Sequence, residues 1–266
     1  MKNCLVTLAN NRRHHEVINL INNVNSNLLC GTNDFDFIIF HEKGFDKKNL
    51  PVFNGRGNFF SYEINLDINQ FAEKIRYETP ALHYGFSIGY RMMCRFFAGE
   101  IFKILKNLNY EYMMRLDTDS SFYEKVNYNL FDKLKNKNAF YGFVSVHNDA
   151  IEFSNDLLIY VNQYAQNKQT NLNFYKVINN QSNLVYYNNF EILKLSEFTC
   201  ENYLFFYDFL DSKNGFLKYR WGDHAVRFLY TNLFMAQDKI LYYENLPYFH
   251  QIDLKNKPFL LKNYWD

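Results

Sequence analysis

The sequence has few cysteines, prolines and glycines: its 266 residues include four, four and ten of them. The cysteines are far apart, at Cys4, Cys30, Cys94 and Cys200, and form no C-x-x-C pair, which argues against a structural zinc site or thioredoxin-type chemistry. No G-x-G-x-x-G follows the first apolar run, and no P-loop occurs anywhere. Dinucleotide-binding and P-loop ATP-binding functions are therefore disfavoured.

An excess of one charge and a long apolar run are also absent. Lys and Arg number 29 against 28 Asp and Glu, so no nucleic-acid partner is expected. The N-terminus lacks a signal-peptide pattern, and no apolar run approaches the roughly 20 residues of a membrane span, so no transmembrane segment is predicted. We expect a soluble protein; the cytoplasm is one compatible location, and the compartment stays open.

Aromatic residues, in contrast, make up 20% of the chain and apolar residues 48%, enough for a large core. No Pro/Gly/Ser-rich linker or charge block divides the sequence, so we predict one domain over residues 1–266. Apolar runs at Cys4–Ala9 and Phe37–Phe40 flank a helical stripe from Val17 to Val24. This β-α-β opening predicts an α/β fold with a Rossmann-like sheet.

Later segments continue the alternation of strands and helices. Strands are expected at Phe59–Ile64, Tyr110–Leu116, Ala139–Val144, Asn188–Leu193 and Ile240–Tyr243. Helices are expected from about Tyr90 and at Asp156–Tyr164, Tyr203–Leu210 and Ala225–Phe234.

Two aspartates one residue apart, Asp117 and Asp119, end the central apolar run that begins at Tyr110. If both continue the strand, they share one face and project from its carboxyl end, where ligands bind in open α/β sheets. A divalent cation carrying a diphosphate would relieve their mutual repulsion. The pattern alone is weak, because Asp34 and Asp36 have the same spacing but precede an apolar run and so start a strand.

Five further residues have a structural interpretation that competes with a functional one. Arg91 and Arg95 share a helix face, which is either solvated or a clamp for a diphosphate. Glu191 inside an apolar run is either an exposed strand residue or a catalytic acid. Asp223 precedes a helix and could be its N-cap. His250 follows two aromatic residues, and an isolated histidine in such surroundings is more often structural than a metal ligand.

Several stretches, taken in order, resemble glycosyltransferase family 15, the fungal Kre2/Mnt1-type α-1,2-mannosyltransferases. The stretches that carry the resemblance are Val6-Thr7-Leu8-Ala9, Tyr90-Arg91-Met92-Met93-Cys94-Arg95-Phe96, Tyr112-Met113-Met114-Arg115-Leu116-Asp117-Thr118-Asp119, Tyr141-Gly142-Phe143, Asn189-Phe190-Glu191-Ile192, Gly215-Phe216, Tyr219-Arg220-Trp221-Gly222-Asp223 and Asp238-Lys239-Ile240 through His250. Together they extend over nearly the whole chain.

The resemblance implies a GT-A fold with a mixed central sheet flanked by helices. It also implies GDP-mannose as donor, a glycan or glycoprotein acceptor, Mn²⁺ (with Mg²⁺ as the alternative) and retention of anomeric configuration. By position, the metal ligands would be Asp117, Asp119 and His250, and the catalytic residues Glu191 and Asp223. The substrate-binding residues would be Tyr90, Arg91, Arg95, Asp119, Asn189, Tyr219 and Trp221.

The sequence departs from the family pattern at several points. Asp117 is one methylene shorter than the family's glutamate, Thr118 replaces a proline, and Asn10 replaces an arginine after the first strand. Residues 144–149 differ from the acceptor-side sequence of the family. Two alternatives stay open: the same fold using glucose, galactose or N-acetylglucosamine from another nucleotide sugar, and an inactive member acting as a carbohydrate-binding or scaffold protein.

Overall fold

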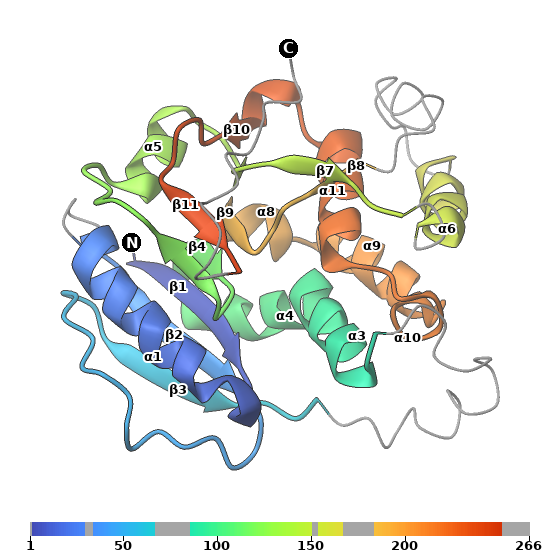
Figure 1. The fold of residues 1–266 in the computed structure, drawn as a ribbon. Helices are drawn as coiled ribbons and strands as arrows, with labels where there is room; N and C mark the ends of the chain where they lie inside the picture. Colours follow the sequence, from blue (N-terminus) through green and yellow to red (C-terminus); the bar gives the residue numbers. More distant parts are fainter. Residues whose placement is uncertain (1, 30–33, 67–85, 151–153, 167–183, 252–266) are drawn as a thin grey trace.

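The chain folds around a mixed β-sheet with helices on both faces (Figure 1). The structure, a computed structural model, describes residues 2–29, 34–66, 86–150, 154–166 and 184–251. Within these residues the main sheet has seven strands in the order β10-β6-β9-β4-β1-β2-β3. Strand β9 runs antiparallel to both neighbours, and the other pairs are parallel. The predicted mixed central sheet is therefore confirmed.

The strands of the main sheet follow the predicted ranges closely, whereas the shorter strands and three of the described helices, over residues 130–136, 195–198 and 215–219, had no predicted counterpart. The strands of the main sheet are β1 (Lys2–Ala9), β2 (Asp36–His41), β3 (Phe59–Glu63), β4 (Tyr110–Leu116), β6 (Tyr141–Phe143), β9 (Phe190–Lys194) and β10 (Ile240–Tyr242). Two short antiparallel ladders pair β5 (Ser120–Phe122) with β11 (Tyr248–His250), and β7 (Val146–Asn148) with β8 (Leu184–Tyr186). The α-helices are α1 (His14–Asn23), α3 (Ile88–Arg95), α4 (Ile101–Leu105), α5 (Leu130–Asn136), α6 (Asn155–Gln166), α8 (Leu195–Phe198), α9 (Glu201–Asp211), α10 (Gly215–Tyr219) and α11 (Asp223–Phe234).

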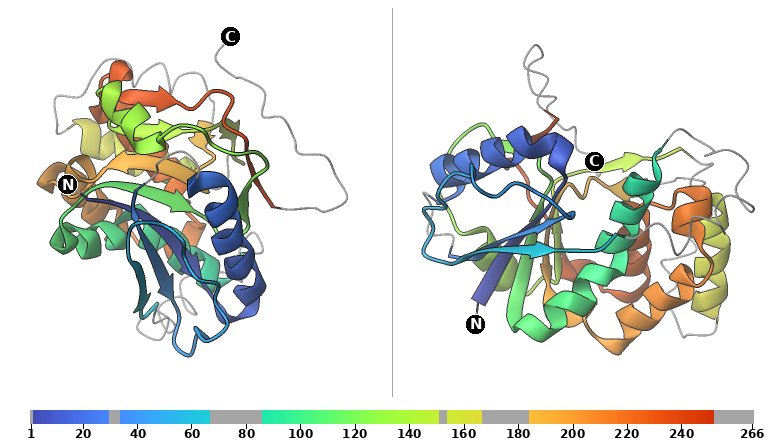
Figure 2. Two further views of the ribbon diagram at one scale, coloured as in Figure 1. Left: turned by 90° about the vertical axis from the view of Figure 1, so that its left-hand side faces the viewer. Right: turned by 90° about the horizontal axis from the view of Figure 1, so that it is seen from below.

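The sheet separates two apolar cores. Because side chains alternate along a strand, Leu5 of β1 packs toward α1 and α5, while Cys4 and Val6 pack toward α3, α4, α9 and α11. The views in Figure 2 show helices on both sides of the sheet. None of the described helices combines the length and the apolar character needed to cross a bilayer.

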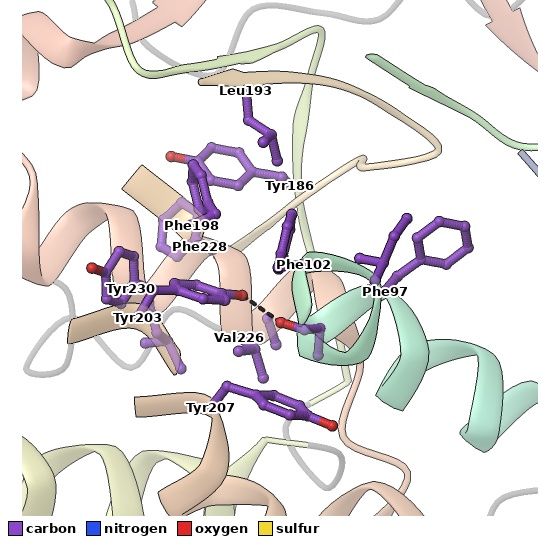
Figure 3. Close-up of a cluster of buried hydrophobic side chains, with 14 of the residues drawn as sticks. Phe97, Phe102, Tyr186, Leu193, Phe198, Tyr203, Tyr207, Val226, Phe228 and Tyr230 are labelled. Atoms are coloured by element: carbon purple, nitrogen blue, oxygen red, sulfur yellow. Dashed lines mark hydrogen bonds between the residues drawn. The ribbon is translucent and has the colours of Figure 1, made fainter. Parts of the chain in front are cut away.

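The larger core, on the α9 and α11 side, explains the high aromatic content. Figure 3 shows rings from several elements meeting there, including Phe102, Phe198, Tyr203 and Tyr230. The Tyr203 and Tyr230 rings meet edge to face with their centroids 4.6 Å apart. Such pairs contribute about 0.5–1.5 kcal/mol each beyond area burial. The Tyr203 hydroxyl donates to the Ala98 carbonyl, so burying this tyrosine leaves no polar group unpaired.

The second pair of aspartates has a structural role, as predicted. Asp34 is exposed, and Asp36 begins β2 with its side chain only 1% exposed. Its carboxylate accepts hydrogen bonds from the Tyr110 hydroxyl at 2.8 Å and the Asn58 N–H at 2.7 Å, and pairs with the Lys2 ammonium. Burial alone would raise the pKa of Asp36, but these partners outweigh it and hold the pKa below its ordinary value.

We expect Asp36→Asn to destabilise the fold by about 1.5–3 kcal/mol at pH 7, because it removes a charged acceptor with several donors. Since the folded-state pKa is depressed, the carboxylate's contribution is present above the unfolded-state pKa of about 3.9 and is lost as pH falls through the folded-state value. Urea unfolding from pH 7 to pH 3 measures this difference. Asp34→Asn, at the exposed partner position, is the control; equal curves for the two variants would contradict the prediction.

Candidate functional site

Asp117 and Asp119 lie in a tight turn at the carboxyl end of β4. The Ser120 N–H donates to the Asp117 carbonyl at 3.0 Å, which closes the turn between β4 and β5. The Thr118 hydroxyl donates to Glu16 of α1 at 2.6 Å. The carboxylates of Asp117 and Asp119 therefore converge because of a turn, and the prediction that strand alternation would align them is wrong in its geometry.

His250 reaches this turn from the far end of the chain. Strand β11 pairs with β5 so that His250 lies opposite Ser120, and the Gln251 N–H donates to the Asp119 carbonyl at 3.1 Å. The His250 Nε2 atom lies 2.9 Å from Asp119 Oδ1 and 3.9 Å from Asp117 Oδ2. The β5–β11 ladder thus joins a histidine to two aspartates that are more than a hundred positions away in sequence.

These three side chains suit a divalent cation. One ligand atom from each of Asp117, Asp119 and His250 lies within 4.8 Å of the other two, and all three side chains are partly accessible. Two carboxylate oxygens with one imidazole nitrogen form a donor set that Mn²⁺ accepts. Burial would raise the pKa of Asp119, but the hydrogen bond and charge of His250, with a smaller effect of Arg13, hold it below its ordinary value. Asp119 is therefore ionised near neutral pH, as a metal ligand must be.

A buried arginine connects this triad to the interior. Arg115 of β4 is 2% exposed, and its Nε donates to Asp117 Oδ1 at 2.9 Å. Its Nη1 donates to Asp223 Oδ2, and its guanidinium lies 3.6 Å from the centre of the Phe97 ring. Arg115 occupies one oxygen of Asp117 and leaves the other, Oδ2, facing His250.

Asp223 is a member of this buried network and does not act as a helix cap. Gly222 occupies the N-cap position of α11. The Asp223 carboxylate accepts from Arg115 and, at 2.7 Å, from the Asn188 side-chain amide. Burial would raise the pKa of Asp223, but the charges of Arg115 and His224 outweigh it and lower the pKa. The N-cap interpretation is therefore wrong, and Asp223 is a paired carboxylate directly behind the metal-binding turn.

Glu191 lies one strand further from the triad. It pairs with Arg115 across β9 and β4, so both side chains project from the same face of the sheet. Glu191 is 0% exposed, which excludes the interpretation of an exposed strand residue. Its two oxygens lie 3.0 and 3.4 Å from nitrogens of Arg227, which is also fully buried. Its predicted catalytic role therefore has to operate from within a buried ion pair.

The two predicted clamp arginines bind protein groups. Arg91 is 1% exposed and donates to the carbonyl oxygens of Leu217 and Lys218 in α10, which ties α10 to α3. Arg95 makes a bidentate pair with Asp211 of α9, with both contacts at 2.7 Å. The solvated-face interpretation is wrong for Arg91, and the partners described for both arginines lie in α9 and α10, outside the Asp117–Asp119–His250 triad.

The other predicted substrate-binding residues are distributed over two places. Asn189 lies beside the triad, where its carbonyl accepts from the Asp117 N–H at 3.0 Å and its side chain accepts from the Tyr248 hydroxyl at 2.9 Å. Tyr90 is half-buried, and Arg220 donates to its hydroxyl at 3.5 Å. The residues that flank Arg220 are Tyr219, which is 37% exposed, and Trp221, which is fully buried in the core.

Three residues of the site were not predicted from the sequence. Arg13 follows β1, and its Nη1 lies 3.4 Å from Asp119 Oδ2. Tyr187 contacts His250, and Arg115 bridges two carboxylates. Only Arg115 carries a usable signal: an arginine inside the apolar run of a central strand has to be paired, because an unpaired buried charge is very costly.

Comparison with known proteins identifies the family. The family described as glycolipid 2-alpha-mannosyltransferase matches residues 1–258. The chain belongs to this family. An O-glycoside alpha-1,2-mannosyltransferase homolog from Schizosaccharomyces pombe is 33% identical over 70% of the chain, and a probable mannosyltransferase from Candida albicans is 29% identical over 72%. The matches extend over 53% and 51% of these two relatives, so the chain spans about half of their length.

Solved structures similar to this glycolipid 2-alpha-mannosyltransferase family member establish its fold. Core-mannan synthase A from Aspergillus fumigatus, in a Mn/GDP form, aligns with a TM-score of 0.80 over 94% of this chain and 74% of that one, at 20% identity. The mannosyltransferase Ktr4p from S. cerevisiae, in complex with GDP, aligns with a TM-score of 0.76 over 94% and 71%, at 23% identity. The expected GT-A fold is confirmed.

Proposed function

We propose that this protein is a metal-dependent, retaining α-mannosyltransferase that moves mannose from GDP-mannose to a glycan or glycoprotein acceptor, with an α-1,2 linkage as in the family name. The observation that carries the proposal is the Asp117–Asp119–His250 triad at the carboxyl end of a central strand, in a member of this family. Two structural relatives, core-mannan synthase A in its Mn/GDP form and Ktr4p in complex with GDP, support the choice of donor. We further propose that residues 1–266 form a single catalytic domain, since the main sheet joins strands from both ends of the chain.

In this proposal the triad binds the metal, and neighbouring side chains contact the substrates. Asp117, Asp119 and His250 would hold Mn²⁺, or Mg²⁺ in its place. The cation, when bound, supplies positive charge that offsets the charge developing on the leaving diphosphate. Arg13 is half exposed beside Asp119 and adds a second positive group at the same edge. Tyr90 and Tyr219, both partly accessible, are proposed to contact the sugars.

The buried carboxylates behind the triad are proposed to act on the anomeric carbon through their charge. Asp223 is paired with Arg115, and Glu191, opposite Arg115 on the neighbouring strand, is paired with Arg227, so each carboxylate is held in place by an arginine. A carboxylate held in this way needs no reorganisation when positive charge develops on an oxocarbenium-like sugar. Retention requires either nucleophilic attack by such a carboxylate or same-face attack by the acceptor, and product anomericity measured by NMR tests the stereochemical claim.

A panel of nucleotide sugars tests the donor assignment. We expect GDP-mannose with Mn²⁺ to raise the melting temperature and to release GDP when an acceptor is added. At a concentration of 100 Kd, ligand binding stabilises the native state by about 2.7 kcal/mol. UDP-glucose, UDP-galactose and UDP-N-acetylglucosamine serve as controls. Stabilisation by one of these, and not by GDP-mannose, would contradict the donor assignment; binding without turnover would favour an inactive carbohydrate-binding protein.

A further inference from the structure

Tyr187 lies between the end of β8 and the start of β9, next to the metal-binding triad. Its hydroxyl is 3.0 Å from His250 Nδ1, the ring nitrogen that faces away from the aspartates. The two rings are nearly perpendicular, at 88°, with centroids 5.5 Å apart. The backbone N–H of Tyr187 donates to the Ser145 carbonyl at 2.9 Å. The hydroxyl therefore reaches His250 from a fixed backbone position.

The two nitrogens of a neutral imidazole have opposite roles: one donates a hydrogen bond and the other accepts. Because Asp119 is ionised, Nε2–H of His250 donates to it when no metal is bound, and in the neutral ring Nδ1 then accepts from the Tyr187 hydroxyl. To bind a cation through Nε2, the ring has to carry its proton on Nδ1, which then becomes a donor. A tyrosine hydroxyl can both donate and accept, so Tyr187 satisfies Nδ1 in both states.

The surroundings of Tyr187 limit its movement. It is half-buried, and the His147 ring meets it edge to face, at 85° with centroids 5.5 Å apart. The Asn189 side chain also interacts with its hydroxyl. Asn189 is itself held by Tyr248, which contacts Ser120. These contacts connect Tyr187 through Asn189 and Tyr248 to Ser120 at the metal-binding turn, so the hydroxyl is kept in line with His250.

We propose that Tyr187 is a positioning residue for the metal ligand His250, whose ring orientation and proton position it sets for metal binding through Nε2. This inference rests on the metal site of the proposed function. It assigns to Tyr187 the place that a carboxylate or a backbone carbonyl commonly takes behind a metal-binding histidine.

The test is Mn²⁺ binding to Tyr187→Phe without nucleotide, measured by isothermal titration and by the electron paramagnetic resonance signal of free Mn²⁺. Phenylalanine keeps the ring and removes only the hydroxyl. We expect the affinity for Mn²⁺ to fall about 10–100-fold, as is usual when a histidine ligand loses its hydrogen-bonding partner. The matched control is Tyr186→Phe, which removes the neighbouring buried hydroxyl that bonds Thr231 of α11, and which should bind Mn²⁺ with wild-type affinity.

A second measurement reads the proton position directly. In protein with ¹⁵N-labelled histidine, saturation with diamagnetic Zn²⁺, which binds imidazole nitrogen, should move the His250 proton to Nδ1, and Tyr187→Phe should reduce this shift at equal Zn²⁺. If wild type binds Mn²⁺ and Tyr187→Phe binds it equally well, the inference is overturned and the metal site stands. If wild type binds no Mn²⁺, the metal site and the inference both fail. If Tyr187→Phe does not fold, the wild-type spectra provide the test, because a proton that stays on Nε2 at saturating Zn²⁺ overturns the inference.

Discussion

Asp119→Asn is expected to lower mannosyl transfer about 10³-fold, which corresponds to about 4 kcal/mol of transition-state stabilisation, while the protein stays folded. Asparagine has the same shape and still accepts the hydrogen bond that His250 makes to Asp119 Oδ1 at 2.9 Å. It lacks the negative charge that holds a divalent cation beside Asp117. Turnover with GDP-mannose over a range of Mn²⁺ concentrations measures the effect, together with a direct Mn²⁺ titration.

The matched control for this variant is Asp34→Asn, the same substitution in the other D-x-D of the chain. Asp34 is exposed and precedes β2, so turnover and metal affinity should equal those of wild type. Removal of metal with EDTA should reduce wild-type turnover to the level of Asp119→Asn, and added Mn²⁺ should restore wild type alone. An Asp119→Asn protein with wild-type turnover and wild-type Mn²⁺ dependence would contradict the assigned metal site.

Glu191→Gln is expected to destabilise the fold by about 3–5 kcal/mol, because it leaves a fully buried Arg227 without its counter-charge. Both side chains are 0% exposed, so water cannot take the place of the missing charge. Chemical denaturation at pH 7 measures the loss. Glu201→Gln, at an exposed position in the first turn of α9, should cost less than about 1 kcal/mol. A loss as small as that of Glu201→Gln would contradict the buried ion pair.

The double variant Glu191→Gln, Arg227→Met separates the structural role of Glu191 from its predicted catalytic role. Removing both charges should restore most of the stability, because replacing a buried pair by uncharged groups is often neutral. If the charge of Glu191 acts on the sugar, turnover of this folded double variant should stay about 10³-fold below wild type. Recovery of both stability and turnover would show that Glu191 serves only as the partner of Arg227.

Local sequence patterns predicted the strands of the main sheet and the fold class well. The continuous apolar runs in β1 and β2 can be buried only in a sheet covered on both faces. The helical stripe of α1 lies between these runs in the sequence, as expected for a helix that connects two parallel strands. The resemblance of ordered motifs supplied the family, and the end of the apolar run of β4 located the metal-binding turn. These features depend on neighbouring residues, whose spacing is visible in the sequence.

Side-chain partners were predicted poorly, because they come from distant segments that the sheet and its covering helices bring together. Arg91 and Arg95 find their partners in α10 and α9, more than a hundred positions later. Their spacing on α3 therefore could not distinguish a binding site for a diphosphate from structural contacts between helices. Glu191 faces Arg227, and Tyr187 faces His250, for the same reason. The sequence alone determined where the strands end and which acids follow them. Only the tertiary structure decided which of those acids are ion-paired in the interior and which remain accessible to a metal, because the order of the strands sets which side chains meet.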